Sequence, residues 1–248
     1  MSDSEETQLL TGHQPVQEAL KQRRRALHRI WVSRKSGAPE LVRLAGIAGM
    51  SLREVDPVEL GRIAGHGKHQ GVVLECGPLP VFSIDELIRF EPSGGEDLLV
   101  MTTGIEDPRN LGAVVRCCLF LGARAMLVPG RGSSPLSSTV SRTSSGALES
   151  LPIAVVSGAA NACRRLRSEG YDIVGVELGG APLWEWREVS KKTALVIGGE
   201  DRGLGQGIRK LCDRLVTIPG TDSVGSLNVS VAAGIALYHV LERRSRGQ

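Results

Sequence analysis

The stretch LLVMTTGIEDPRNLGAVVRCC at residues 98–118 decides the fold class. An apolar run over 98–104 predicts a buried strand, Asp107 and Pro108 turn the chain, and a helix is predicted over 110–121. The same order of strand and helix recurs toward the end of the chain. Further strands are predicted at 124–130, 172–178, 193–199 and 215–220, and further helices at 136–147, 158–169, 207–211 and 227–243. This alternation is typical of an α/β domain with a parallel sheet covered by helices on both faces.

Upstream of this domain, we interpret residues 9–77 as a small mixed α/β module. Helices are predicted at 15–21, 40–49 and 58–63, and strands at 27–33, 52–55 and 71–76. The prolines and glycines of 78–97 indicate a linker, with one short helix predicted over 82–90. We therefore expect a disordered tail at 1–8, a first domain at 9–77, the linker at 78–97 and a second domain at 98–248.

The composition indicates a globular protein of one large or two smaller domains, with 248 residues and 41% hydrophobic side chains. No apolar run is long enough to cross a bilayer. The acidic start MSDSEETQ differs from secretory and mitochondrial targeting segments. The five cysteines show neither a CxxC pair nor Cys/His ligand spacing, so we expect neither a disulfide framework nor a zinc site. These observations favour a cytoplasmic protein.

Basic residues are concentrated near the N-terminus, although the net charge is only +3. Residues 21–35 contain seven basic side chains and no acid, which suits either the binding of nucleic acid phosphates or a solvated helix end and loop. The loop GHGKHQG at 65–71 offers donors to phosphates or bases, and its histidines lack the acidic or thiolate companions of a metal site. The predicted RNA-binding residues are Arg23, Arg24, Arg25, Lys68, His69 and Arg142.

Three glycine-containing segments lie where predicted strands end, which is the edge at which parallel α/β sheets bind ligands. In the first segment, Asn110 is placed to cap a helix. Arg116 lies on another side of that helix, where it could contact a phosphate or a ribose. A capped helix with a surface arginine is the alternative. The second, ALVIGGEDRGLGQG at 194–207, has five glycines that permit close ligand approach, and Glu200 to accept hydrogen bonds. It lacks the spacing of a dinucleotide fingerprint, and an ordinary flexible turn is its alternative.

The third segment, TIPGTDSVGSLNVSVAAGIALYHV at 217–240, leads from a short strand through glycines into an apolar helix. It places Ser226, Asn228 and Ser230 at the predicted start of that helix. Unpaired backbone N–H groups at a helix N-terminus suit a polar ligand or a phosphate. Helix capping by serine and asparagine is the alternative, and the two upstream segments favour a shared binding site.

The three segments, taken in order, resemble the three motifs of the SpoU (TrmH-like) family, part of the SPOUT superfamily of RNA 2′-O-ribose methyltransferases. The matching residues are NLGAVVR at 110–116, IGGEDRGLG at 197–205 and IPGTDSVGSLNVSVA at 218–232. TGHQPVQEAL at 11–20 and GKHQGVVLE at 67–75 resemble the family's small ribosomal-protein-like RNA-binding module. The whole pattern is most similar to the branch that modifies a guanosine of 23S ribosomal RNA.

The resemblance implies a deep trefoil knot in the second domain, with S-adenosylmethionine bound inside it and no metal. It also implies a homodimer through the C-terminal helix, where Val231, Ile235 and Tyr238 form a stripe. The cofactor-binding residues that it implies are Gly198, Gly199, Gly203, Ile218, Leu227 and Ser230. The catalytic residues that it implies are Arg116, Asn110, Glu200, Ser226 and Asn228.

The implied activity is 2′-O-methylation of a guanosine ribose in large-subunit ribosomal RNA. We expect Arg116 to grip a phosphate and to stabilise the oxyanion that develops as the ribose hydroxyl is deprotonated, because a guanidinium stays protonated in proteins. Two other functions are compatible with the sequence. One is the same reaction on a transfer RNA, and the other is a non-catalytic RNA-binding factor in ribosome assembly.

Overall fold

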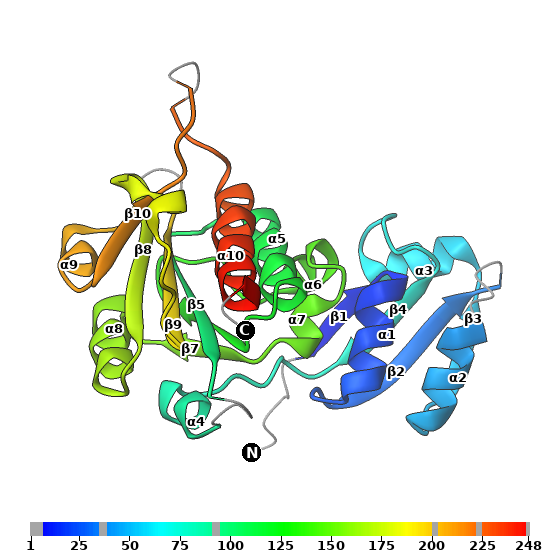
Figure 1. Cartoon of the computed structure of the whole chain (residues 1–248). Coiled ribbons are helices and arrows are strands. Elements are labelled where there is room, and N and C mark those ends of the chain that lie inside the picture. Colours follow the sequence, from blue (N-terminus) through cyan, green and yellow to red (C-terminus); the bar gives the residue numbers. More distant parts are fainter. Residues whose placement is uncertain (1–6, 35–38, 91–94, 200–202, 222–224, 247–248) are drawn as a thin grey trace. The chain divides into compact units, whose positions relative to one another are not determined.

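The computed structural model describes residues 7–34, 39–90, 95–199, 203–221 and 225–246. Contacts between residues divide the chain into two compact units. The first unit comprises Met1–Pro80 and Leu136–Ser150, and the second comprises Val81–Pro135 and Leu151–Gln248. The chain therefore passes between the units three times, after residues 80, 135 and 150. Figure 1 colours the elements of both units by residue number.

The first unit is built on a four-stranded mixed sheet. Its strands are β1 (Gln8–Thr11), β2 (Leu27–Ser33), β3 (Leu52–Val55) and β4 (Val72–Cys76), in the order β1-β4-β2-β3. β4 is antiparallel to β1 and β2, whereas β2 and β3 are parallel. Its helices are α1 (His13–Gln22), α2 (Pro39–Ile47), α3 (Pro57–Ala64), α6 (Ser138–Thr143) and α7 (Ala147–Ser150). Ile30 and Val32 are buried on one face of β2, as their alternation predicts.

The short helices α6 and α7 pack within the first unit, although the sequence places them beyond the linker. Between them, Ser145 and Gly146 have positive φ angles of 53° and 84°, which break the single helix predicted over 136–147. A Cβ at Gly146 would lie 2.9 Å from the backbone oxygen of Gln14 in α1, so only glycine fits at this approach. The compact units thus differ from the predicted domain boundaries in the segment 136–150.

The second unit has a six-stranded sheet in which every pair of neighbouring strands is parallel. The strands are β5 (Asp97–Thr103), β6 (Ala125–Pro129), β7 (Ile153–Val156), β8 (Asp172–Pro182), β9 (Lys192–Gly198) and β10 (Arg214–Thr217). Their order is β10-β8-β9-β5-β6-β7. The parallel α/β class predicted from the sequence is confirmed, whereas β7 is a strand that the sequence does not predict.

Helices cover both faces of this sheet. They are α4 (Ile84–Arg89), α5 (Pro108–Phe120), α8 (Ala159–Ser168), α9 (Gln206–Arg209) and α10 (Val229–Arg246), with a 3₁₀ turn η1 (Leu183–Glu185). Figure 1 shows α5 and α10 side by side on one face and α8 and α9 on the other. Leu99, Met101 and Val196 point into the core beneath α4 and α8. None of the described helices is long and apolar enough to cross a membrane.

The arrangement brings the carboxyl ends of β5, β6 and β9 to one edge of the sheet, because all three strands run in the same direction. The three segments singled out in the sequence follow β5, β9 and β10. The trefoil knot stays a prediction, because the path of the chain there includes residues 200–202 and 222–224, which lie outside the described residues.

Candidate active site

Two adjoining cavities open at this edge of the second unit. The larger has a volume of about 650 Å³, and we call it the Asn110 cavity. The smaller has a volume of about 410 Å³, and we call it the Leu227 cavity. Gly199, Gly203 and Val229 line both. Volumes of this size are typical of sites for nucleotides and cofactors.

The Leu227 cavity collects most of the predicted cofactor residues. It is lined by Val176, Glu177, Leu178, Ile197, Gly198, Gly199, Gly203, Arg209, Thr217, Ile218, Ser226, Leu227, Val229 and Ala232. Five of the six predicted cofactor residues are in this set, and Ser230 is not. A Cβ at Gly198 would lie 2.4 Å from the carbonyl carbon of Gly203, so a glycine is needed where the two backbones meet. Apolar walls with bare backbone suit the adenosine part of a cofactor.

Glu177, at the point where β8 departs from regular pairing with β10, shapes the glycine loop of this cavity. Its Oε1 accepts a hydrogen bond from the backbone N–H of Leu204 at 3.0 Å, and its Oε2 lies 3.1 Å from Nε of Arg209. Gly203 adopts a φ of +54° beside this carboxylate, and Gly203 N donates to Gly199 O at 3.0 Å. Glu177 is therefore a positioning residue, and sequence analysis did not identify it.

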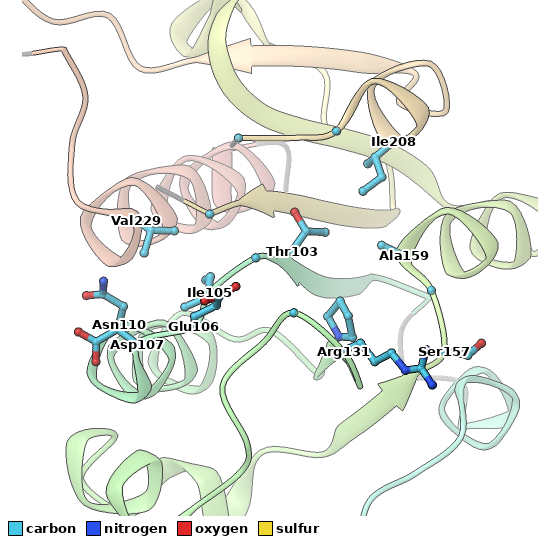
Figure 2. A pocket seen from close by; sticks show the side chains of 17 residues that line it. Thr103, Ile105, Glu106, Asp107, Asn110, Arg131, Ser157, Ala159, Ile208 and Val229 are labelled. Carbon is cyan, nitrogen blue, oxygen red and sulfur yellow. The ribbon is translucent and has the colours of Figure 1, made fainter. Parts of the chain in front are cut away.

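The Asn110 cavity extends from the start of α5 across the ends of β5 and β6 to the start of α8 (Figure 2). Its lining residues are Thr103, Gly104, Ile105, Glu106, Asp107, Asn110, Pro129, Arg131, Gly132, Ser157, Gly158, Ala159, Gly199, Gly203, Gly205, Ile208 and Val229. Sequence analysis named Asn110 and missed Glu106 and Arg131. Both lie within two residues of the end of a predicted strand, so the rule that ligands bind at the carboxyl ends of parallel strands could have found them.

Asn228 links the first and third sequence segments. Its Nδ2 donates a hydrogen bond to Asn110 Oδ1 at 3.0 Å, which joins the start of α10 to α5. Its Oδ1 accepts from Ser230 N at 3.0 Å and from Ser230 Oγ at 2.6 Å. Asn228 therefore caps α10 and holds the side chain of Asn110 at the same time. The capping interpretation is confirmed, and a ligand-binding role of the segment stays a prediction. Ser226 lies apart from this group and lines the Leu227 cavity.

Arg116 lies on the exposed side of α5 and is not among the described residues that line either cavity. It stands about 9 Å along the helix axis from Asn110, at 1.5 Å per residue. Its neighbour Cys117 is half-buried, and burial raises the pKa of this thiol while the charge of Arg116 opposes the rise. Glu200, the remaining predicted catalytic residue, lies outside the described residues. Elsewhere in the described chain, no group of three His, Cys, Asp or Glu side chains is placed to hold a metal ion.

In the first unit, the three consecutive arginines have different environments, and the RNA assignment of Arg25 needs correction. Arg25 is 3% exposed, and its Nε lies 2.7 Å from Glu149 Oε2. Its Nη2 donates to Glu149 Oε1 at 3.1 Å. Arg24 donates to the backbone oxygens of Glu149 and Pro80, and burial lowers its pKa. Arg25 is therefore an internal structural residue, whereas Arg23 is exposed and donates to the backbone oxygen of Ile47.

The other predicted RNA-binding residues gather around His66. The pKa of His66 is lowered first by burial and then by the charges of Arg142, His69 and Lys68, so these basic groups lie near His66. His66 Nδ1 accepts from Lys68 N at 3.2 Å, and His69 Nδ1 accepts from Gly71 N at 3.1 Å. In the neutral imidazoles this leaves each Nε2–H as a donor. We call these four residues the His66 cluster, and its composition suits an anion.

Comparison with known proteins agrees with this geometry. The SpoU rRNA Methylase family matches residues 97–238, and the RNA 2′-O ribose methyltransferase substrate binding family matches residues 9–82. A putative TrmH family tRNA/rRNA methyltransferase, YacO of Bacillus subtilis, is 30% identical over 98% of this chain and 98% of its own. An uncharacterized tRNA/rRNA methyltransferase of Mycolicibacterium smegmatis is 32% identical over 97% of this chain and 78% of its own.

Solved structures share the fold over nearly the whole chain. A crystal structure of an RNA 2′-O ribose methyltransferase superposes with a TM-score of 0.82, at 27% identity, over 98% of this chain and 91% of that one. The SpoU methyltransferase AviRb from Streptomyces viridochromogenes, in complex with the cofactor AdoMet, has a TM-score of 0.81 at 24% identity, over 97% and 92% of the two chains. The likeness to AviRb concerns the fold alone. With both of its units matched, this chain belongs to the SpoU rRNA methylase family.

Proposed function

We propose that this protein transfers a methyl group from S-adenosylmethionine to the 2′-hydroxyl of a ribose in large-subunit ribosomal RNA, at a guanosine. One observation carries the proposal: the Leu227 cavity, which is lined by five of the six predicted cofactor residues, adjoins the Asn110 cavity at Gly199, Gly203 and Val229. A methyl donor in the first and a ribose in the second would meet at this shared wall. Methyl transfer needs such juxtaposition, because positioning of the two reactants lowers much of the barrier.

S-adenosylmethionine, when bound, supplies an electrophilic methyl group. We expect Ile218 and Leu227 to cover its adenosine, with the backbone of Gly198 in close approach. Glu177 keeps the glycine loop in place through the N–H of Leu204. Because each of these groups lines one cavity, a substitution in that wall should weaken cofactor binding before it affects RNA binding.

The chain must also position the ribose and accommodate the charge that develops when its 2′-hydroxyl loses a proton. The Asn110 amide, held by Asn228, is placed to orient the ribose. We assign Arg116 the stabilisation of the developing oxyanion and a contact to phosphate, because arginine side chains are cations in proteins. Glu200 would help to orient the cofactor loop, and Ser226 would help to hold the third segment.

In this proposal, the His66 cluster and the exposed Arg23 bind the RNA. Their charges suit phosphates, and the near absence of aromatic residues, at 3% of the chain, argues against base stacking. A match of residues 9–82 to a substrate-binding family supports this role. It also favours ribosomal over transfer RNA in our proposal, since we expect tRNA-modifying members to lack such a module.

We further propose a homodimer through α10. Val231, Ile235 and Tyr238 are 48%, 38% and 61% exposed, and Phe120 of the adjacent α5 is 85% exposed. Four large apolar side chains exposed on two packed helices form an unusual surface for a monomer. A second copy of the same surface would cover them.

The proposal is tested by mapping 2′-O-methyl groups in ribosomal and transfer RNA from cells with and without the gene. We expect one ribosomal guanosine to lose its methyl group. If methyl groups are lost only from transfer RNA, the substrate is transfer RNA and not ribosomal RNA. If no methyl group is lost from either RNA, the non-catalytic role is favoured.

Arg116→Ala gives the matching test of mechanism. Since removal of one electrostatic stabiliser of an oxyanion costs roughly 10²–10³-fold in rate, methyl transfer to RNA should fall by about that factor. RNA binding in a filter assay should be nearly unchanged. Arg164→Ala, an exposed arginine on α8, is the control for loss of one positive charge. If the Arg116→Ala variant methylates RNA at the wild-type rate, Arg116 has no catalytic role.

A further inference from the structure

The Asn110 cavity is lined by one acidic and one basic side chain, Glu106 and Arg131, that make no hydrogen bond or ion pair with the described part of the chain. Glu106 follows β5 and Arg131 follows β6, and both are exposed at the cavity (Figure 2). Within the described part of the chain, neither side chain makes a hydrogen bond or an ion pair. Other charged side chains at this edge of the sheet form ion pairs, as Asp107 does with Arg109 and Glu177 with Arg209.

Asp107 and Asn110, the polar residues of the cavity at the start of α5, are already in use. Asp107 caps α5 by accepting from Arg109 N at 2.8 Å, and it pairs with the Arg109 guanidinium at 3.0 Å. Asn110 is bonded to Asn228 at 3.0 Å. The remaining walls are largely glycine and apolar side chains. A ligand that fills this cavity would therefore find its charged partners in Glu106 and Arg131.

Glu106 and Arg131 together suit a ligand that has hydrogen-bond donors for the carboxylate and an anionic group for the guanidinium. A carboxylate is an acceptor with two oxygens side by side, so its best partner presents two adjacent N–H donors. A guanidinium pairs with phosphate through parallel N–H groups. A nucleotide carries both a base edge and a phosphate, and the cavity volume of about 650 Å³ admits one.

Among the four RNA bases, guanine alone places two donors next to each other. Its N1–H and its 2-amino group form a pair that a carboxylate can accept together. Adenine and cytosine each offer one amino group beside an acceptor nitrogen, and uracil offers one N–H between two carbonyls. A carboxylate would face an acceptor lone pair in all three, which disfavours them.

We propose that Glu106 selects guanine at the target position by accepting hydrogen bonds from N1–H and the 2-amino group, while Arg131 contacts a phosphate of the same RNA strand. This inference rests on the proposed function, since it places the target nucleotide in the Asn110 cavity. Enzymes that act on one nucleotide read an extruded base at its Watson–Crick edge in this way. The assignment makes Glu106 a specificity residue and gives it no part in methyl transfer itself.

The test uses a synthetic RNA that spans the mapped methylation site, made with guanosine or with inosine at the target. Inosine differs from guanosine only by lacking the 2-amino group. We expect wild-type kcat/KM to fall about tenfold on inosine, the size of one lost base-edge contact. Glu106→Gln should methylate guanosine RNA about tenfold more slowly and should no longer distinguish the two RNAs.

Two further variants separate base reading from other effects. Arg131→Ala should slow both RNAs equally and keep the preference for guanosine, because phosphate contacts carry no base information. Glu185→Gln, an exposed acid of η1 outside both cavities, should behave as wild type. Equal wild-type rates on the two RNAs, a full guanosine preference in Glu106→Gln, or a mapped target other than guanosine each overturn the inference. If the wild type methylates no RNA, the proposed function fails and the inference fails with it.

Discussion

The buried thiol of Cys76 makes the stability of the first unit sensitive to alkaline pH. Cys76 is fully buried at the end of β4, and burial raises its pKa to about 11. An unfolded chain releases the thiol proton near pH 8.5, whereas the folded chain holds it to about pH 11. The stabilising contribution is therefore complete below the unfolded pKa and is lost as the pH rises through the folded pKa.

We predict that the free energy of unfolding falls between pH 9 and pH 11, by roughly 1.4 kcal/mol per pH unit from this thiol. Urea unfolding at several pH values measures the slope. Lysines and tyrosines also titrate in this range, so the informative quantity is the difference from Cys76→Ala. The slope of that variant should be smaller, and equal slopes would show that the thiol ionises while folded.

Single residues differ in how well the sequence predicts their roles. The positions of Asn110 and of the glycines of the Leu227 cavity at the ends of the strands could be predicted, because a family motif ties residue type to position, whereas their roles stay predictions. Arg25 could not, since a run of arginines looks the same whether a side chain is solvated or meets a carboxylate. Its partner Glu149 is 124 positions away in the sequence.

Among the elements, α7 depends on a buried charge. Glu149 of α7 is 1% exposed and accepts from Arg25 in a bidentate pair and from Ser141 Oγ at 2.8 Å. Arg25 Nη1 also donates to the backbone oxygen of Gly77 at 3.1 Å, beside β4. The pair thus connects α6 and α7 to the central sheet of the first unit.

Glu149→Ala should destabilise the first unit by about 3–5 kcal/mol, because removing one partner leaves a buried guanidinium without a counter-charge. Chemical unfolding followed by circular dichroism gives the value. Glu40→Ala is the control, since it removes an exposed ion pair with Arg43 in the same unit and should leave the unfolding midpoint in place. A midpoint shift for Glu149→Ala no larger than that of the control would contradict the assignment.

The elements that sequence analysis missed are short. β1 and β7 have four residues each, a length at which the alternating pattern is weak, although β3, which is equally short, was predicted. The long periodic helices were predicted to within a few residues, as for α10, expected at 227–243 and found at Val229–Arg246. The break between α6 and α7 depends on the approach of α1, which no local pattern contains.

At the scale of the whole molecule, the proposed dimer predicts a concentration-dependent mass. Tyr238→Asp places a charge in the exposed apolar surface of α10 and should convert a dimer into a monomer, measured by analytical ultracentrifugation. Val42→Asp, at a 56% exposed valine of α2, tests whether any surface charge has this effect. A wild type that stays monomeric at high concentration would exclude the proposed dimer.

The class of the second unit could be predicted from the alternation of strands and helices, whereas the strand order could not. Parallel pairing of β5 with both β6 and β9 is set by side-chain packing across the sheet, and many orders satisfy the same alternation. The extent of the compact units also escaped prediction, because residues 136–150 carry no composition that separates them from their surroundings.

The three passages of the chain between its units have a practical consequence for anyone who wishes to transplant the RNA-binding part. A fragment ending at residue 80 would lack α6 and α7, and with them the carboxylate that neutralises Arg25. A deletion of the same residues would leave Glu149 in the remainder without its guanidinium. A transplanted first unit must therefore include both of its segments, residues 1–80 and 136–150. A hybrid that exchanges only residues 1–80 keeps the Arg25–Glu149 pair only if the new segment supplies its own arginine at this place.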